Sequence, residues 1–120
     1  MILVDTSVWI DHFHKKDHSL IKLLEDGLVY THHFIIGELA CGNLKNRDEI
    51  LILLQSLPKV RVAEHDEVMY FLNHHKIFGK GLGYIDVHLL ASCFLDNQLI
   101  FTRDKHLERI AKEFNIIYEC

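Results

Sequence analysis

Two stretches decide the fold of this chain: MILVDTSVWID at residues 1–11 and LIFTRDKHL at residues 99–107. Each begins with a short run of apolar residues, which is typical of a strand buried on both faces of a parallel sheet. An aspartate then separates the apolar run from a helical pattern. Because the carboxyl ends of parallel strands meet at one edge of a sheet, we expect Asp5 and Asp104 to lie together at that edge.

The rest of the chain continues this alternation of strand and helix. We predict strands at 2–4, 28–31, 59–62, 99–102 and 116–118, and helices at 7–13, 17–26, 33–42, 47–57, 64–78, 85–97 and 104–114, with Asp66 as the N-cap of the fifth helix. This order implies an α/β fold with a central parallel sheet of four to five strands flanked by helices. The sequence has no internal repeat or linker, so we expect one domain over residues 1–120.

The composition indicates a globular protein. Apolar residues make up 49% of the chain and there is one proline. No apolar run approaches the roughly 18 residues of a membrane span, and the amino terminus lacks the basic stretch of a signal peptide, so we expect a cytoplasmic location. The three cysteines form no CxxC pair. We expect Cys41 and Cys93, which lie in apolar helical patterns, to be reduced core residues.

Two further carboxylates lie among apolar residues: Glu38 within FIIGELAC, and Asp86 at the start of IDVHLLASC. Each acid also has a structural explanation, because Glu38 can lie on an exposed helical stripe and the three aspartates can cap helices. If the four converge, their charges raise one another's pKa unless a cation neutralises them. Carboxylate oxygens suit Mg²⁺ or Mn²⁺ better than zinc. The pattern therefore predicts metal-assisted phosphodiester hydrolysis.

The net charge of −4 at first argues against a nucleic-acid substrate, since phosphate contacts need positive charge. Setting aside the four proposed ligands leaves 13 acidic residues against 13 lysines and arginines. The remaining surface is balanced, so composition neither supports nor excludes RNA.

The acidic residues stand in four stretches that resemble the motifs of PIN domains, in order: VDTSVWID, FIIGELACG, GYIDVHLLAS and TRDKHL. Length and coverage, about residues 1–118, are most similar to the VapC-type toxins of bacterial toxin–antitoxin pairs. The resemblance implies an endoribonuclease in which Asp5, Glu38, Asp86 and Asp104 bind Mg²⁺ or Mn²⁺ and a metal-activated water cuts RNA. It also implies that Ser7 and Thr102 hold the site in shape.

The same resemblance implies two protein partners, a second copy of the chain in a homodimer and a small antitoxin whose C-terminal segment blocks the crevice. One position departs from the pattern. Many relatives carry a fifth acid two residues after the position of Asp104, and His106 stands there instead. This departure bears on the occupancy of a second metal site more than on activity.

Other features suggest sites that we do not favour. The ten histidines have no zinc-site spacing, and adjacent histidines on a helix do not face one another. The GKGLG loop at 79–83 lacks the order and the preceding strand of a dinucleotide site. Lys80 in this loop, Arg103 and His88 are candidate RNA contacts, with an ordinary solvated face as the alternative for the basic residues.

Three other functions are alternatives to a toxin ribonuclease. An aspartyl phosphatase would need a second aspartate two residues after Asp5, where Ser7 stands. A housekeeping PIN nuclease of RNA processing has the same residues as a toxin, so the sequence does not separate the two. The alternative from another class is a catalytically idle interaction module, against which the presence of all four mutually repelling acids argues.

Overall fold

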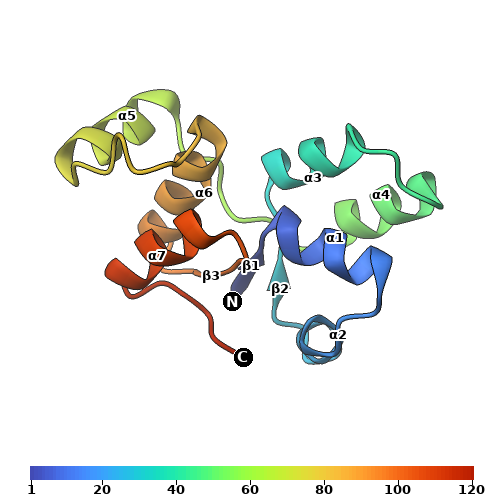
Figure 1. Ribbon diagram of the computed structural model, residues 1–120. Helices are drawn as coiled ribbons and strands as arrows, with labels where there is room; N and C mark the ends of the chain where they lie inside the picture. Colours follow the sequence, from blue (N-terminus) through green and yellow to red (C-terminus); the bar gives the residue numbers. More distant parts are fainter.

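The computed structural model describes residues 1–120 and contains a three-stranded parallel sheet in the order β2-β1-β3 (Figure 1). Its strands are β1 (Ile2–Val4), β2 (Val29–Tyr30) and β3 (Leu99–Phe101). Leu3 in the central strand pairs with Tyr30 on one side and Ile100 on the other. All three residues of β1 are buried, as expected for an apolar strand covered on both faces. The predicted α/β class and parallel direction are confirmed.

The prediction of four to five strands is wrong, because the segments at 59–62 and 116–118 do not form strands. Each makes one isolated parallel bridge, Thr31 with Lys59 and Ile100 with Ile117. The backbone bonds around these bridges are short, from 2.7 to 2.9 Å. Their neighbours β2 and β3 are only two and three residues long, so the outer segments find little extended backbone with which to pair.

All seven predicted helices are present: α1 (Thr6–His14), α2 (His18–Glu25), α3 (His33–Ala40), α4 (Arg47–Ser56), α5 (His65–His74), α6 (Tyr84–Leu95) and α7 (Lys105–Glu113). The predicted helix at 64–78 runs too long, because Lys76 and Gly79 adopt left-handed backbone conformations that a helix does not accommodate. Its N-cap is Glu64, not Asp66. The Glu64 N–H donates to the Glu67 side chain at 2.9 Å, and Asp66 lies within the first turn.

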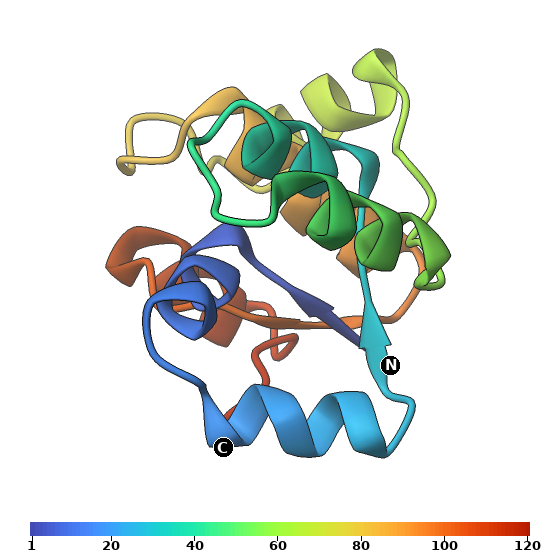
Figure 2. The ribbon, with the colours of Figure 1, turned by 90° about the vertical axis from the view of Figure 1, so that its right-hand side faces the viewer.

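The helices form two groups on either side of the strands (Figure 1), and Figure 2 views the molecule from the side of the first group. We call α1–α4 (residues 6–56) the N-terminal half and α5–α7 (residues 65–113) the C-terminal half. In the first, α3 packs against α1 and α4; in the second, α6 packs against α5 and β3. Trp9, completely buried, stacks on Phe13 with 5.8 Å between ring centroids. The site described below spans the two halves.

The prediction that Cys41 and Cys93 are core residues is only partly correct. Cys93 is buried, but Cys41 is exposed because it is the C-cap of α3, where that helix leaves the core. In α4 the apolar stripe at 50–57 contributes Leu54 to the core, whereas Ile52 and Leu53 are 70% and 46% exposed. None of the helices combines the length and the apolar character that crossing a membrane requires.

Candidate active site

Asp5 occupies the end of β1 and is 6% exposed. Its Oδ2 accepts hydrogen bonds from the hydroxyls of Ser7, at 2.7 Å, and Thr102, at 2.8 Å. It also caps α1 through a longer contact of 3.4 Å with the Ser7 N–H. The capping interpretation of Asp5 is therefore confirmed, and the same carboxylate also accepts from two hydroxyls.

Two backbone N–H donors determine the direction in which the Ser7 and Thr102 hydroxyls donate their protons. Ser7 Oγ accepts from the Arg103 N–H at 3.0 Å, and Thr102 Oγ1 accepts from the Asp104 N–H at 3.1 Å. Because each hydroxyl accepts from a backbone donor, its own proton is free to be donated to Asp5. Both protons reach Oδ2, and no protein group donates to Oδ1.

Glu38 lies on α3 with its side chain at the rim of the site, so the exposed-stripe interpretation describes its position. Its Oε1 accepts a hydrogen bond of 2.9 Å from Thr6 Oγ1. Partial desolvation raises the pKa of Glu38, and the charges of Asp5 and Asp86 raise it further, against the opposing effect of the Thr6 hydroxyl. Sequence reasoning missed Thr6, although a hydroxyl directly after the first acid was a usable signal.

Asp86 is half-buried in the first turn of α6 and is not its N-cap, which is Gly83. Its Oδ2 accepts from the Gly83 N–H at 3.2 Å. Burial raises the pKa of Asp86, and the charges of Asp5 and Asp104 add to that effect, while the Gly83 hydrogen bond and His106 lower it. His106 therefore lies close enough to the site for its charge to act on Asp86.

Asp104 is exposed and caps α7, where its Oδ1 accepts from the Leu107 N–H at 3.0 Å. The amphipathic pattern of this helix explains its position, since Leu107, Ile110 and Ala111 are buried against the core. Packing of this face sets the start of the helix directly after β3. The carboxylate of Asp104 is thus placed at the same sheet edge as Asp5, as the order of strand and helix predicts.

Electrostatic coupling links all four acids in one region. The charges of Asp5 and Asp86 raise the pKa of Glu38, and the charges of Asp5 and Asp104 raise the pKa of Asp86. No three side chains of His, Cys, Asp or Glu come close enough together to hold a metal ion in this arrangement. The donor set fits a hard divalent cation, because every donor is a carboxylate oxygen and Oδ1 of Asp5 is free of protein donors.

The candidate RNA contacts fall into different environments. The Arg103 guanidinium is engaged by Asp17 and, at 2.9 Å, by Asp11, so it is not a free cation. His88 is only 3% exposed, with its ring 4.6 Å from that of Phe34, so its contact with RNA stays a prediction that this buried position does not favour. Lys80 is exposed and forms no ion pair; its backbone carbonyl accepts from Arg109 at 3.2 Å.

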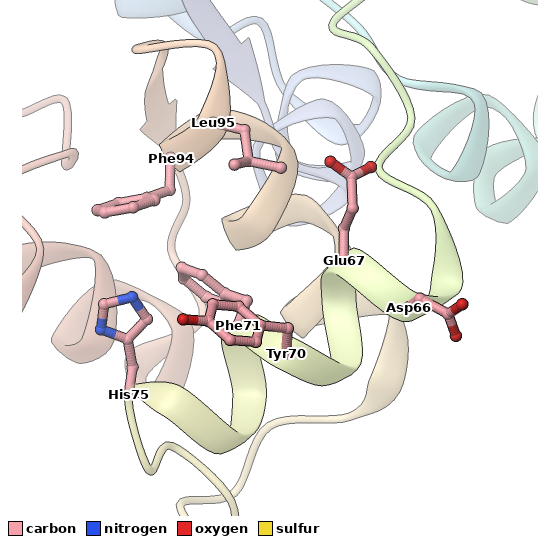
Figure 3. A pocket seen from close by; sticks show the side chains of 7 residues that line it. All are labelled: Asp66, Glu67, Tyr70, Phe71, His75, Phe94 and Leu95. Carbon is pink, nitrogen blue, oxygen red and sulfur yellow. The ribbon is translucent and has the colours of Figure 1, made fainter.

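An apolar groove of about 390 Å³ lies between α5 and α6, where the sequence pattern indicated no site (Figure 3). The rings of Tyr70, Phe71 and Phe94 face it, and His75 stands at one end (Figure 3). None of the four acids lines this groove. It is therefore a feature separate from the candidate active site.

Comparison with known proteins identifies the family. A family model described as the PIN domain matches residues 2–113, and these residues include all four acids. The chain belongs to the PIN-domain family. Curated relatives of this PIN domain include the proteins named Ribonuclease VapC32 from two strains of Mycobacterium tuberculosis, CDC 1551 / Oshkosh and ATCC 25618 / H37Rv. Each is 42% identical over 117 residues, which cover 97% of this PIN domain and 94% of the relative.

Proposed function

We propose that this PIN domain is a metal-dependent endoribonuclease, and that it acts as the toxin of a toxin–antitoxin pair. The observation that carries the proposal is the electrostatic coupling of Asp5, Glu38, Asp86 and Asp104 at one edge of the sheet. The relatives named as ribonucleases support RNA as the substrate. Carboxylates that raise one another's pKa are costly to a fold, and a bound cation relieves that cost.

Each acid has a definite part in this proposal. Asp5 is the central ligand, because Ser7 and Thr102 both donate to its Oδ2 and leave its Oδ1 free. Glu38, Asp86 and Asp104 approach from α3, α6 and the start of α7 and complete an oxygen-only donor set for Mg²⁺ or Mn²⁺. A bound divalent cation would supply a water activated for attack on phosphorus and would neutralise the charge that develops on the phosphate.

Four basic residues in the segment before α6 and on α7 support an RNA path: Lys76, Lys80, Lys105 and Arg109. None of them forms an ion pair, in contrast to Arg61, Arg103 and Lys112, which are paired with acids. Lys76 and Lys80 lie in the segment before α6, and the other two lie on α7. Unpaired cations are free to replace counterions on the RNA backbone, so local charge favours binding despite the net charge of −4.

The partners of the proposed toxin are an antitoxin and a second copy of the chain. Both rest on the likeness to the VapC relatives. The exposed apolar residues of α4, namely Ile52 and Leu53, and of α5, namely Met69 and Tyr70, provide surface for such contacts. A cytoplasmic location is part of the same proposal, because an intracellular toxin acts on cellular RNA.

The test is cleavage of a mixed RNA substrate by the purified protein with Mn²⁺ or Mg²⁺, beside Asp5→Asn. We expect metal-dependent cutting that EDTA abolishes and that falls at least a hundredfold in the variant, since the charge of the central ligand is lost. Asp26→Asn is the matched control, because Asp26 is an exposed aspartate that pairs only with Lys22. This control should cut RNA at the unaltered rate.

Cleavage that survives both Asp5→Asn and EDTA would overturn the proposed mechanism. Absence of cutting, together with absence of Mn²⁺ binding in calorimetry, would favour the catalytically idle interaction module. The distinction between a toxin and a housekeeping nuclease needs a growth assay. Expression that arrests growth, and does so only with Asp5 intact, supports the toxin.

A further inference from the structure

A buried hydrogen-bond network joins the two halves of the molecule away from the acids. His32, the N-cap of α3, is completely buried, and its Nδ1 accepts from the Phe34 N–H at 3.0 Å. Its Nε2 lies 3.2 Å from Ser92 Oγ in α6, and that oxygen also accepts from the Ala63 N–H at 3.1 Å. One imidazole therefore ties the start of α3 to α6 and to the segment that leads into α5.

The bonding pattern determines the tautomer of this ring. Because Nδ1 accepts from a backbone N–H, it carries no proton, and a neutral ring then carries its proton on Nε2. Nε2–H donates to Ser92 Oγ. Burial lowers the pKa of His32 to about 4, with further lowering by His88 and His33, so the ring is neutral at physiological pH.

The network bridges elements that pack mainly on different partners. α3 packs against α1 and α4 in the N-terminal half, whereas α6 packs against α5 and β3 (Figures 1 and 2). Glu38 follows His32 by six positions, and Asp86 precedes Ser92 by six positions. At the rise of an α-helix, each acid lies about 9 Å along its helix from the link. A small rotation of either helix about the link would therefore change the separation of the two carboxylates.

We propose that the hydrogen bond from His32 to Ser92 is a latch that limits the separation of Glu38 and Asp86, one from each half, so that one divalent cation can draw both carboxylates together. The inference rests on the proposed function and goes beyond it, since His32 touches neither cation nor RNA. His32 is a positioning residue. A histidine suits this position because one ring nitrogen caps α3 and the other nitrogen reaches Ser92 in α6.

Two variants break the latch from opposite sides. Ser92→Ala removes the acceptor on α6, and His32→Asn keeps a side-chain cap for α3 but is too short to reach Ser92. We expect each to weaken Mn²⁺ binding about tenfold in calorimetry, in the range found when supporting residues of metal sites are lost. The double variant should weaken binding no further, because both changes remove the same hydrogen bond.

A distance measurement tests the latch without metal. Spin labels are placed on the native Cys41, at the end of α3, and on a cysteine introduced by Leu95→Cys at the end of α6, with Cys120→Ser to remove the other exposed thiol. Pulsed electron resonance should give a narrow distance distribution with the latch intact. The distribution should broaden in Ser92→Ala and in His32→Asn.

Leu20→Ala is the control for general destabilisation, because Leu20 is completely buried in α2, which carries none of the four acids. Distances that stay narrow in both latch variants, or a control that weakens Mn²⁺ binding as much as they do, would overturn the latch. A native protein that binds no Mn²⁺ would instead overturn the proposed function. In that case, the label distances alone decide whether His32 holds the halves together.

Discussion

The two sides of the site hold their acids with different kinds of hydrogen-bond donor. Asp5 and Glu38, which come from β1 and the N-terminal half, are held by the hydroxyls of Ser7, Thr102 and Thr6. Asp86 and Asp104, which belong to the C-terminal half, are held by backbone N–H groups of Gly83 and Leu107. The first pair therefore depends on side chains, and the second depends on the path of the backbone.

This difference tells us which substitutions can disturb each acid. A hydroxyl donor can be removed by one isosteric substitution that leaves the fold in place. A backbone donor persists through any side-chain change and is displaced only when the loop or helix end itself moves. We therefore expect point substitutions near Asp5 to act on metal binding directly, and substitutions near Asp86 to act through loop conformation.

The largest effect is expected from Thr102→Val, which removes a hydroxyl from the hydroxyl-held side. Metal affinity should fall about ten- to a hundredfold, because Asp5 loses the 2.8 Å donor that orients it. Calorimetric titration with Mn²⁺ measures this. Thr31→Val is the matched control, since Thr31 is also buried at a strand end and its hydroxyl has no partner. Equal loss of affinity in both variants would contradict the role of the hydroxyl.

Gly81→Ala tests the backbone-held side and should have a smaller effect. Gly81 has a φ of +83°, and an added Cβ would lie 2.8 Å from Nδ1 of His106. The loop or the exposed His106 ring must shift, and a shift of the loop displaces the Gly83 N–H, so we expect RNA cleavage to fall about tenfold from misplacement of Asp86. Strain of this kind also costs about 1–2 kcal/mol in the free energy of unfolding.

Gly37→Ala is the control for this substitution. Gly37 lies within α3, and nothing within 4 Å would meet its added Cβ. The helix should gain up to about 1 kcal/mol, as is usual when alanine replaces a helical glycine, and denaturant titration measures both variants. If both glycine variants cut RNA at the native rate, the loop does not position Asp86.

The smallest expected effect is a pH dependence of the stability, which arises from His32 in the link between the two halves. The pKa of His32 is about 4 in the folded protein, below the value of about 6.5 for an unfolded chain, so the unfolded state binds the proton first as pH falls. The contribution of His32 to the free energy of unfolding is constant above the unfolded pKa of about 6.5. It decreases as the pH falls from that value to the folded pKa of about 4. We expect a loss of about 1 kcal/mol by about pH 5.5.

Urea titration across this pH range measures the loss, with His32→Asn for comparison. Other buried or partly buried histidines, among them His75 and His88, also have lowered pKa values and add to the slope. The variant should therefore flatten the profile only in part. An unchanged profile would mean that His32 titrates alike in the folded and unfolded states.

Sequence reasoning predicted the helices well and the sheet poorly. Each of the seven helices is indicated within one continuous segment, by an amphipathic pattern or, in α6, by a long apolar run, so their existence is a local property. The segments at 59–62 and 116–118 look like strands locally, but pairing needs a partner, and β2 and β3 are too short to offer one. Strand formation is decided between segments, which is why the number of strands was wrong.

The same division applies to the site. Asp5 and Asp104 could be placed at one edge from strand order alone, because parallel strands share that edge. The hydroxyl of Thr6 on Glu38, the pairing of Arg103 with Asp11 and Asp17, and the burial of His88 could not be predicted, since each depends on a contact between distant segments.

The amino-acid sequence by itself determined the order of helices and strands, the family to which the chain belongs, and which four acids are candidates for catalysis. These properties follow from local apolar patterns and from the order of the motifs along the chain. Only the tertiary structure decided which donors hold each acid, which cations remain unpaired, and that a buried histidine joins α3 to α6. Those features arise because packing brings together groups such as His32 and Ser92, and no local pattern determines the distance between them.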